Sequence, residues 1–177
     1  MDLLDFSDCK LYFEEPLPAE AERLIAEAAA NYADPAAECA LLRAHLIAPE
    51  HLTVLVALYR YYFYRHRLDE VLIVAEHAKR VSARHLGIPA DWRLLDEQRL
   101  GSAAAISFGL LRFYLLAIKA ESVVLLRQGR IAESRDRLIL LASLDSHDHL
   151  GAAKLLEVVD EFQSDATEES PLTLAAA

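Results

Sequence analysis

Three stretches of the 177-residue chain share one pattern of apolar and small residues, and the first two stand 34 residues apart in register. A period of this length is typical of a helix-turn-helix unit that stacks on similar units. The pattern therefore predicts an all-α fold of stacked antiparallel helix pairs. The matching positions are Leu24, Ala28, Ala37, Leu41, Ala44 and Pro49, then Leu58, Tyr62, Val71, Ala75, Ala78 and Ala83, then Glu121, Leu125, Ser134, Leu138, Leu141 and Ser146.

Helix-breaking residues are scarce, which favours the same fold class. The chain has only 5 glycines and 6 prolines, and its apolar residues form long periodic runs. Hydrophobic residues make up 54% of the sequence. This high share indicates either an unusually complete core or an apolar surface reserved for a partner or for a second copy of the chain.

Start and stop signals divide the chain into helices. Asp34 and Pro35 suit a helix start, whereas Gly87 and Gly129 suit a helix end or a tight turn. We expect an N-terminal arm over 1–18, one helical domain over 19–162 and a flexible C-terminal tail over 163–177, with 87–113 an insertion or a degenerate repeat. The predicted helices cover 19–31, 35–49, 50–66, 68–86, 92–95, 103–128 and 131–144, and the last begins at Asp145 or Ser146 and reaches 162.

The repeated positions resemble the tetratricopeptide repeat (TPR). In that family small residues stand where the two helices of a pair cross, as Ala37, Ala44 and Ala78 do here, and Tyr62 stands at a common aromatic position. The resemblance covers roughly 19–86 and 115–147, with the last helix in the place of a cap. It implies a TPR-like solenoid of about three units with an inserted segment and a capping helix, and it implies protein binding. The repeated glycine of the family is missing, since Ile25, Tyr59 and Ser122 replace it.

A second resemblance concerns two blocks, at 48–60 and 109–117. They look similar to small helical-repeat proteins encoded near nitrogen-fixation genes. This likeness implies a link to nitrogen fixation. Separately, we expect a scaffold that assists the assembly or maturation of another protein.

The balance of charge limits the possible partners. The net charge is −10, which opposes general attraction to nucleic acid or to an anionic membrane. Residues 51–93 nevertheless carry seven basic and four acidic side chains, so a positive middle lies between negative ends. The most apolar window, 103–120, contains Arg112 and Lys119, and we therefore expect a buried central helix rather than a membrane span.

The cysteines and the first residues suggest the compartment. Cys9 and Cys39 stand 30 positions apart and form no CxxC motif, which favours a reduced setting. Asp2 and Asp5 stand where an export signal needs basic residues. We expect a cytoplasmic protein.

The segment from Tyr59 to Arg67 is the main candidate for a binding site. Five of the six residues from 59 to 64 are aromatic, and successive helical residues are about 100° apart, so the rings cannot all face one core. Some rings must meet another layer of helices, a second subunit or a ligand. Tyrosine and arginine are enriched at binding hot spots. The predicted partner-binding residues are Tyr59, Arg60, Tyr61, Tyr64, Arg65 and Arg67.

No motif in the chain points to catalysis. The sequence has no glycine-rich phosphate loop, no HExxH and no GxSxG, so we expect no enzyme activity, no cofactor and no metal. His147 and His149 differ by two positions, which splays them on a helix. The leading hypothesis is an adaptor that binds a protein partner. The alternatives are a structural homodimer through the aromatic helix and a small metal-binding protein.

Overall fold

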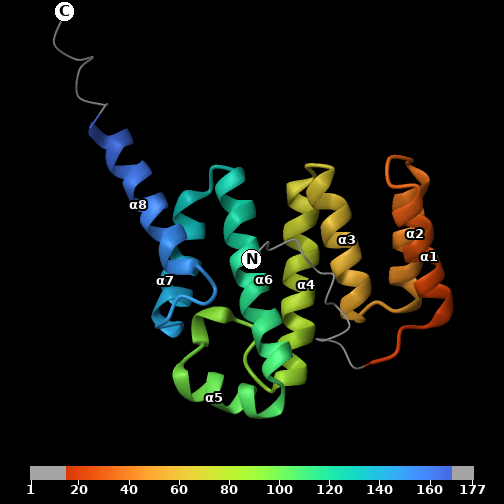
Figure 1. Ribbon diagram of the computed structural model, residues 1–177, viewed down its shortest axis with the longest axis horizontal. Coiled ribbons are helices and arrows are strands. Elements are labelled where there is room, and N and C mark those ends of the chain that lie inside the picture. The colour runs from red at the N-terminus through yellow and green to blue at the C-terminus, as the bar shows by residue number, and fades with distance from the viewer. Residues whose placement is uncertain (1–14, 169–177) are drawn as a thin grey trace, which may run out of the picture.

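The computed structural model describes residues 15–168, with side chains up to 164, and all the regular structure in this range is helical (Figure 1). The predicted all-α class is therefore confirmed. Residues 1–14 of the expected arm and 169–177 of the expected tail lie outside the described residues. The helices are α1 (Ala19–Ala30), α2 (Ala36–Ile47), α3 (Leu52–Tyr64), α4 (Leu68–Leu86), the short 3-10 helix η2 (Trp92–Leu94), α5 (Glu97–Ile106), α6 (Phe108–Arg127), α7 (Ile131–Leu144) and α8 (Ala152–Glu168).

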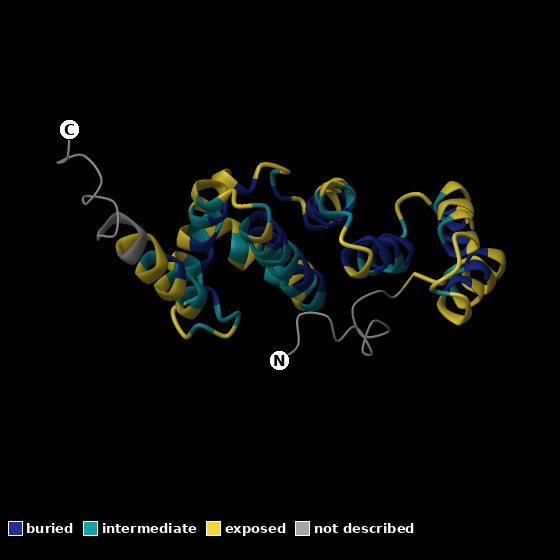
Figure 2. Ribbon diagram, turned by 90° about the horizontal axis from the view of Figure 1, so that it is seen from above, coloured by how far each residue is buried: buried dark blue, intermediate teal, exposed yellow. Residues whose placement is uncertain are grey.

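Helices that follow one another in the chain pack together. The closest pairs are α1 with α2, α3 with α4, and α6 with α7. Helix α4 also packs on α6, and α7 packs on α8, so the pairs form a row in chain order (Figure 1). Buried residues line the middle of the row and exposed residues its outside (Figure 2).

The repeated positions form most of this core. Ala37 and Ala44 are almost fully buried, because small side chains let the backbones of α1 and α2 approach closely. All the predicted positions in the three stretches are buried except Pro49 and Ser146, which are exposed at helix ends. The pattern thus identified the packing face of each helix pair.

Local caps explain several helix boundaries. Asp34 Oδ1 accepts a hydrogen bond from the backbone N–H of Ala36 at 2.7 Å, as the predicted cap requires. Gly87 ends α4 with φ at 65°, and Gly129 turns the chain between α6 and α7 with φ at 73°. This left-handed conformation is one that glycine adopts without strain.

The predicted single helix over 103–128 is wrong. Ser107 is extended, with φ −157° and ψ 108°, and separates α5 from α6. Its Oγ accepts a hydrogen bond from the N–H of Leu110 at 3.2 Å, so serine acts as the N-cap of α6. Gly101 lies inside α5, where glycine costs only about 1 kcal/mol relative to alanine.

The predicted start of the last helix is also wrong. The segment from Asp145 to Gly151 is a loop in which Asp145 Oδ2 accepts from the N–H of Leu150 at 2.7 Å. Asp148 Oδ1 accepts from the N–H of Ala153 at 2.9 Å and caps α8. Helix α8 then continues past the predicted end at 162 to Glu168.

A buried group of charges joins α4, α6 and α7. Lys79 Nζ lies 3.0 Å from Glu121 Oε2, and both side chains are almost fully buried. Arg137 Nε donates to the same carboxylate oxygen at 3.2 Å. Burial raises the pKa of Glu121, and the neighbouring Lys79 and Arg137 offset this rise only in part. The two cations thus offset part of the free-energy cost of burying a carboxylate among apolar side chains.

Candidate functional site

A groove of about 430 Å³ lies between the α1–α2 hairpin and α3. Helix α3 contributes Arg60, Tyr61 and Tyr64, and the connection between α1 and α2 contributes Tyr32. We call these four residues, with the small apolar residues beneath them, the aromatic groove. The apolar residues are Ile25, Ala28, Ala29, Leu41 and Ala57.

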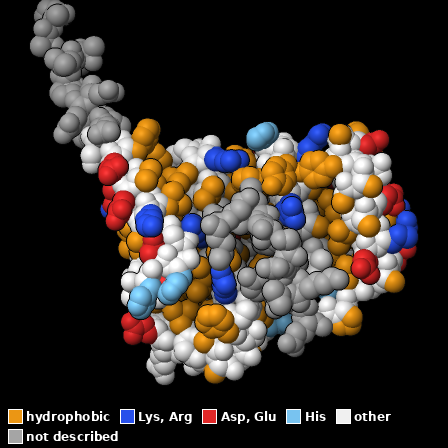
Figure 3. Space-filling model, viewed as in Figure 1, with side chains coloured by type: hydrophobic (Ala, Val, Ile, Leu, Met, Phe, Trp, Pro, Cys, Tyr) orange, Lys and Arg blue, Asp and Glu red, His pale blue; other side chains and the backbone are white. Residues whose placement is uncertain are grey.

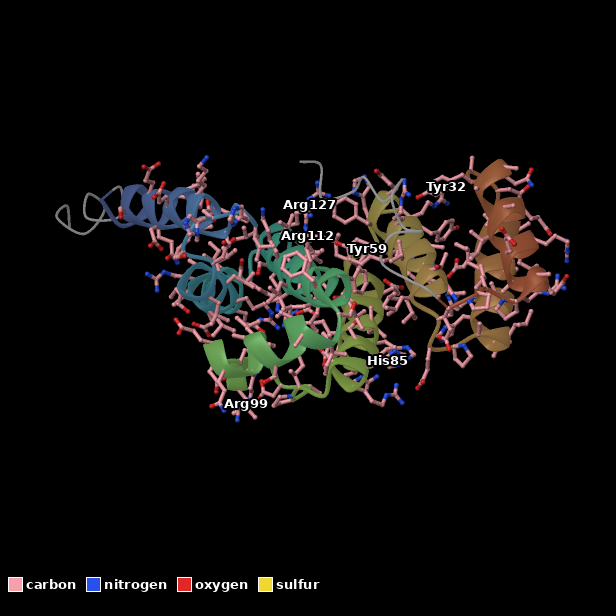
Figure 4. All side chains as sticks on the ribbon, turned by 60° about the horizontal axis from the view of Figure 1, so that its bottom comes forward. Tyr32, Tyr59, His85, Arg99, Arg112 and Arg127 are labelled. Atoms are coloured by element: carbon pink, nitrogen blue, oxygen red, sulfur yellow. The ribbon has the colours of Figure 1, made fainter. Side chains whose placement is uncertain are left out.

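The tyrosines of the aromatic groove hold one another in place. The Tyr32 ring meets Tyr61 and Tyr64 edge to face, with ring centroids 5.4 and 6.3 Å apart. The Tyr32 hydroxyl donates to the backbone carbonyls of Tyr61 at 3.1 Å and Arg60 at 3.3 Å. Burial raises the pKa of Tyr32, and the neighbouring Tyr61 and Tyr64 add to this effect. Figure 4 labels Tyr32 on the side of the hairpin that faces α3.

The rings differ in their access to solvent. Tyr61 is only 3% exposed, whereas Tyr64 is 48% exposed and is followed by the exposed Arg65. Hydrophobic side chains gather at this end of α3, with Lys or Arg side chains close by (Figure 3). A partly exposed tyrosine, supported by the buried Tyr61 and the half-buried Tyr32 and beside guanidinium groups, has the composition of a protein-binding hot spot.

The structure places the other two predicted residues elsewhere. Tyr59 is buried away from the aromatic groove and stacks on Phe63, with ring centroids 6.0 Å apart. Burial raises the pKa of Tyr59, and the nearby Glu121 adds to the effect. Arg67 lies beyond the end of α3, directly before α4, where its guanidinium donates to Glu38 at 2.7 Å and to Glu70 at 2.6 Å.

Arg67 belongs to a structural cluster that ties α2 to α3 and α4. The Tyr62 hydroxyl donates to Glu38 Oε1 at 3.2 Å, and the Arg67 guanidinium stands 4.7 Å from the Tyr62 ring centre. Burial and the Glu38 carboxylate raise the pKa of Tyr62 to about 12. The carboxylates already engage Arg67, so this residue is poorly placed to reach a partner in the aromatic groove.

Sequence reasoning missed Tyr32. An aromatic residue in a short connection, just after Asn31 at the end of α1, is the one local signal that it packs on another element. Its contact with Tyr61 spans 29 positions, and no repeat pattern pairs these residues.

The aromatic groove is suited to binding. It offers ring faces and edges, tyrosine hydroxyls and a guanidinium, and its lining has no nucleophile beside a base. Among the described residues, no three histidine, cysteine, aspartate or glutamate side chains come together as a metal would need. His147 and His149 are 5.5 Å apart between ring centres, in the loop before α8.

Two further findings concern the most apolar helices and the cysteines. None of the described helices combines the length and the apolar character that a bilayer crossing requires. Cys39 is a free, exposed thiol, and Cys9 lies outside the described residues.

Comparison with known proteins identifies a close relative. No family model and no solved structure matches the chain. A protein of Azotobacter chroococcum mcd 1, described as an uncharacterized 19.8 kDa protein in the nifW 5′ region, is 42% identical over 165 residues. The match covers 93% of this chain and 92% of the relative. The chain therefore belongs to the same family as this Azotobacter chroococcum protein.

Proposed function

We propose that the chain is a protein-interaction scaffold or adaptor, a TPR-like helical repeat that binds a partner protein in the aromatic groove. The observation that carries the proposal is the meeting of Tyr32 from the hairpin with Arg60, Tyr61 and Tyr64 from α3. Support also comes from helix pairs that stack in chain order, since such stacks create extended binding surfaces.

The chemistry of the groove suggests what it binds. An apolar side chain of the partner would enter between the hairpin and α3 and lie against Tyr64. Carboxylate or carbonyl oxygens beside it would accept hydrogen bonds from Arg60 and Arg65. The buried Tyr61 and the half-buried Tyr32 would keep Tyr64 in place and so reduce the entropy that binding costs.

The relative suggests the biological setting. Its description places it in the nifW 5′ region, and this chain would accordingly act in the cytoplasm on a protein of nitrogen fixation. An adaptor of this kind would assist the assembly or maturation of its partner. The proposal makes the chain a binding protein rather than an enzyme.

The test compares two double variants of the full chain as baits in lysate from nitrogen-fixing cells. Tyr64→Ala with Arg65→Ala removes an exposed tyrosine of the groove and the exposed arginine that follows it, and Phe108→Ala with Arg43→Ala removes an even more exposed phenylalanine and an exposed arginine on other helices. We expect the first variant to lose about tenfold or more of the captured partner, as hot-spot residues do, and the second to retain it. Equal capture by both variants would rule out the aromatic groove as the binding site.

The same variants distinguish self-association from partner binding. Sedimentation at micromolar concentration reports whether the chain is a monomer or a dimer. A dimer that dissociates only in the Tyr64→Ala, Arg65→Ala variant would assign the groove to a second copy of the chain. A monomer that captures a partner through Tyr64 supports the adaptor.

A further inference from the structure

A second groove, separate from the aromatic groove, runs between α3 and α6 with α4 as its floor. Its lining is almost entirely apolar, with the Tyr59 ring in one wall. We call it the apolar groove. The walls include Leu55, Tyr59, Phe113 and Leu116, and the floor includes Ala75 and Ala78.

Two arginines of α6 stand beside the apolar groove (Figure 4). Arg112 precedes Leu116 by four positions, which places both on the same face of the helix. Arg127 ends α6, and its guanidinium stands 4.4 Å from the centre of the Phe63 ring. An occupant of this groove therefore needs apolar side chains with carboxylates among them.

The described chain begins at one end of the apolar groove. Glu15, Pro16 and Pro18 share a hollow with His51, at the start of α3, and with His85, near the end of α4. His51 Nδ1 accepts from the N–H of Thr53, so Nε2 carries the proton that it donates to the Glu15 carbonyl at 3.1 Å. Leu55 of the groove lies one helical turn beyond His51.

The preceding residues have the composition and the reach that the groove needs. Fourteen residues span at most about 50 Å, whereas the 13 residues of α3 extend over about 20 Å. The segment 1–14 carries four carboxylates and one basic residue, Lys10. Its large apolar residues are Leu3, Leu4, Phe6, Leu11, Tyr12 and Phe13.

We propose that residues 1–14 bind in the apolar groove of their own chain, with their apolar side chains over α4 and their carboxylates near Arg112 and Arg127. The tether at Glu15 gives the segment an effective concentration in the millimolar range, so modest affinity is enough to fill the groove. A partner that uses this groove must displace the segment. The inference is independent of the function proposed for the aromatic groove.

Disulfide trapping in the full chain tests the proposal. A Cys39→Ser background leaves Cys9 as the native thiol, and a second cysteine is introduced either by Leu116→Cys in the groove or by Leu46→Cys on α2. Leu46 is 81% exposed and lies outside the groove. It stands near the end of α2, only five positions before His51, so it is a stringent control. Oxidised glutathione accepts the two electrons when the paired thiols join. We expect the intrachain disulfide to form about tenfold faster or more with Leu116→Cys.

Two results would overturn the proposal. One is equal or faster trapping at Leu46→Cys in protein that retains its helical circular dichroism. The other is a disulfide between two chains that persists on dilution, which would assign the groove to the segment of a second copy. If Leu116→Cys disturbs the fold, Ala120→Cys in the same wall replaces it.

Charge reversal provides a second measurement. Arg112→Glu with Arg127→Glu is expected to slow trapping at Leu116→Cys several-fold at low salt and to leave trapping at Leu46→Cys unchanged. An unchanged rate at Leu116→Cys would contradict the role given to the two arginines. Aromatic-groove binding in the same variant is expected to stay intact, which separates this test from that of the proposed function.

Discussion

At the scale of single residues, Glu121 is the most unusual member of the core. It occupies the position that Leu24 and Leu58 hold in the first two stretches, and it is only 2% exposed. Lys79 Nζ lies within ion-pairing distance of both Glu121 and Glu76, although neither contact has hydrogen-bond geometry. The pairing of the two buried charges is thus mainly electrostatic, and each depends on the other.

Removing one of these charges should destabilise the fold strongly. Glu121→Ala leaves Lys79 buried without its buried partner, and we expect the free energy of unfolding to fall by about 3–5 kcal/mol in urea denaturation. Glu20→Ala, which removes an exposed carboxylate paired with Arg23, serves as the control and should leave the midpoint unchanged. Similar midpoints for the two variants would show that the buried pair contributes no more than a surface pair.

At the scale of elements, two glycines differ in the backbone conformation that they adopt. Gly87 ends α4 with positive φ, whereas Gly101 lies in α5 with open space where a Cβ would stand. Gly87→Ala should therefore cost about 1–2 kcal/mol from backbone strain. Gly101→Ala should stabilise the protein by about 0.5–1 kcal/mol. Thermal unfolding of both variants checks the signs, and a loss of stability on Gly101→Ala would contradict the assignment of this residue to a helix.

The α1–α2 hairpin should loosen in acid. Its His45 and the His77 of α4 meet edge to face, with ring centroids 5.7 Å apart. Burial lowers the pKa of His77, as do the nearby His45, Arg80 and Arg84, whereas Glu50 opposes them. Below the ordinary histidine pKa of about 6.5, the unfolded chain therefore binds a proton that folded His77 resists, and stability falls as pH falls.

Hydrogen exchange measures this loosening. Between pH 7 and about pH 5.5, protection of the α1 and α2 amides, corrected for intrinsic rates, should fall more than protection of α6. His77→Gln should remove most of the difference, because glutamine does not titrate. A pH response that is the same in the variant would place the sensitive group elsewhere.

At the scale of the whole molecule, buried tyrosines should set the alkaline limit of the fold. Burial raises the pKa of Tyr59 and of Tyr114, and the pKa of Tyr62 is raised to about 12. Above about pH 10 the unfolded chain loses protons that these folded residues keep. Stability is thus complete below pH 10 and is lost as pH rises through the folded pKa values.

An alkaline titration tests this coupling. Tyrosinate absorbance from the buried rings should appear together with the loss of helical circular dichroism. Tyr114→Phe should move this transition to higher pH, since the variant has one fewer raised pKa and its hydroxyl has no hydrogen-bond partner. Complete tyrosine ionisation near pH 10 in a chain that stays helical would contradict the prediction.

The sequence by itself determined which residues form the core and where most helices lie. The 34-residue pattern identified the buried positions, and the predicted helices 68–86 and 131–144 match α4 and α7. Such features depend on helical periodicity and on local backbone hydrogen bonds, which are encoded in neighbouring residues. The two boundary errors, at Ser107 and at Asp148, have the same physical origin. Several capping residues compete there, and packing selects between them.

Only the tertiary structure decided which residues the aromatic side chains of α3 contact. Periodicity required the rings of α3 to point in more than one direction. It could not show that Tyr32 lies across Tyr61, or that Glu38 engages Arg67. These contacts join residues nearly thirty positions apart, and their geometry depends on how one helix pair is set against the next.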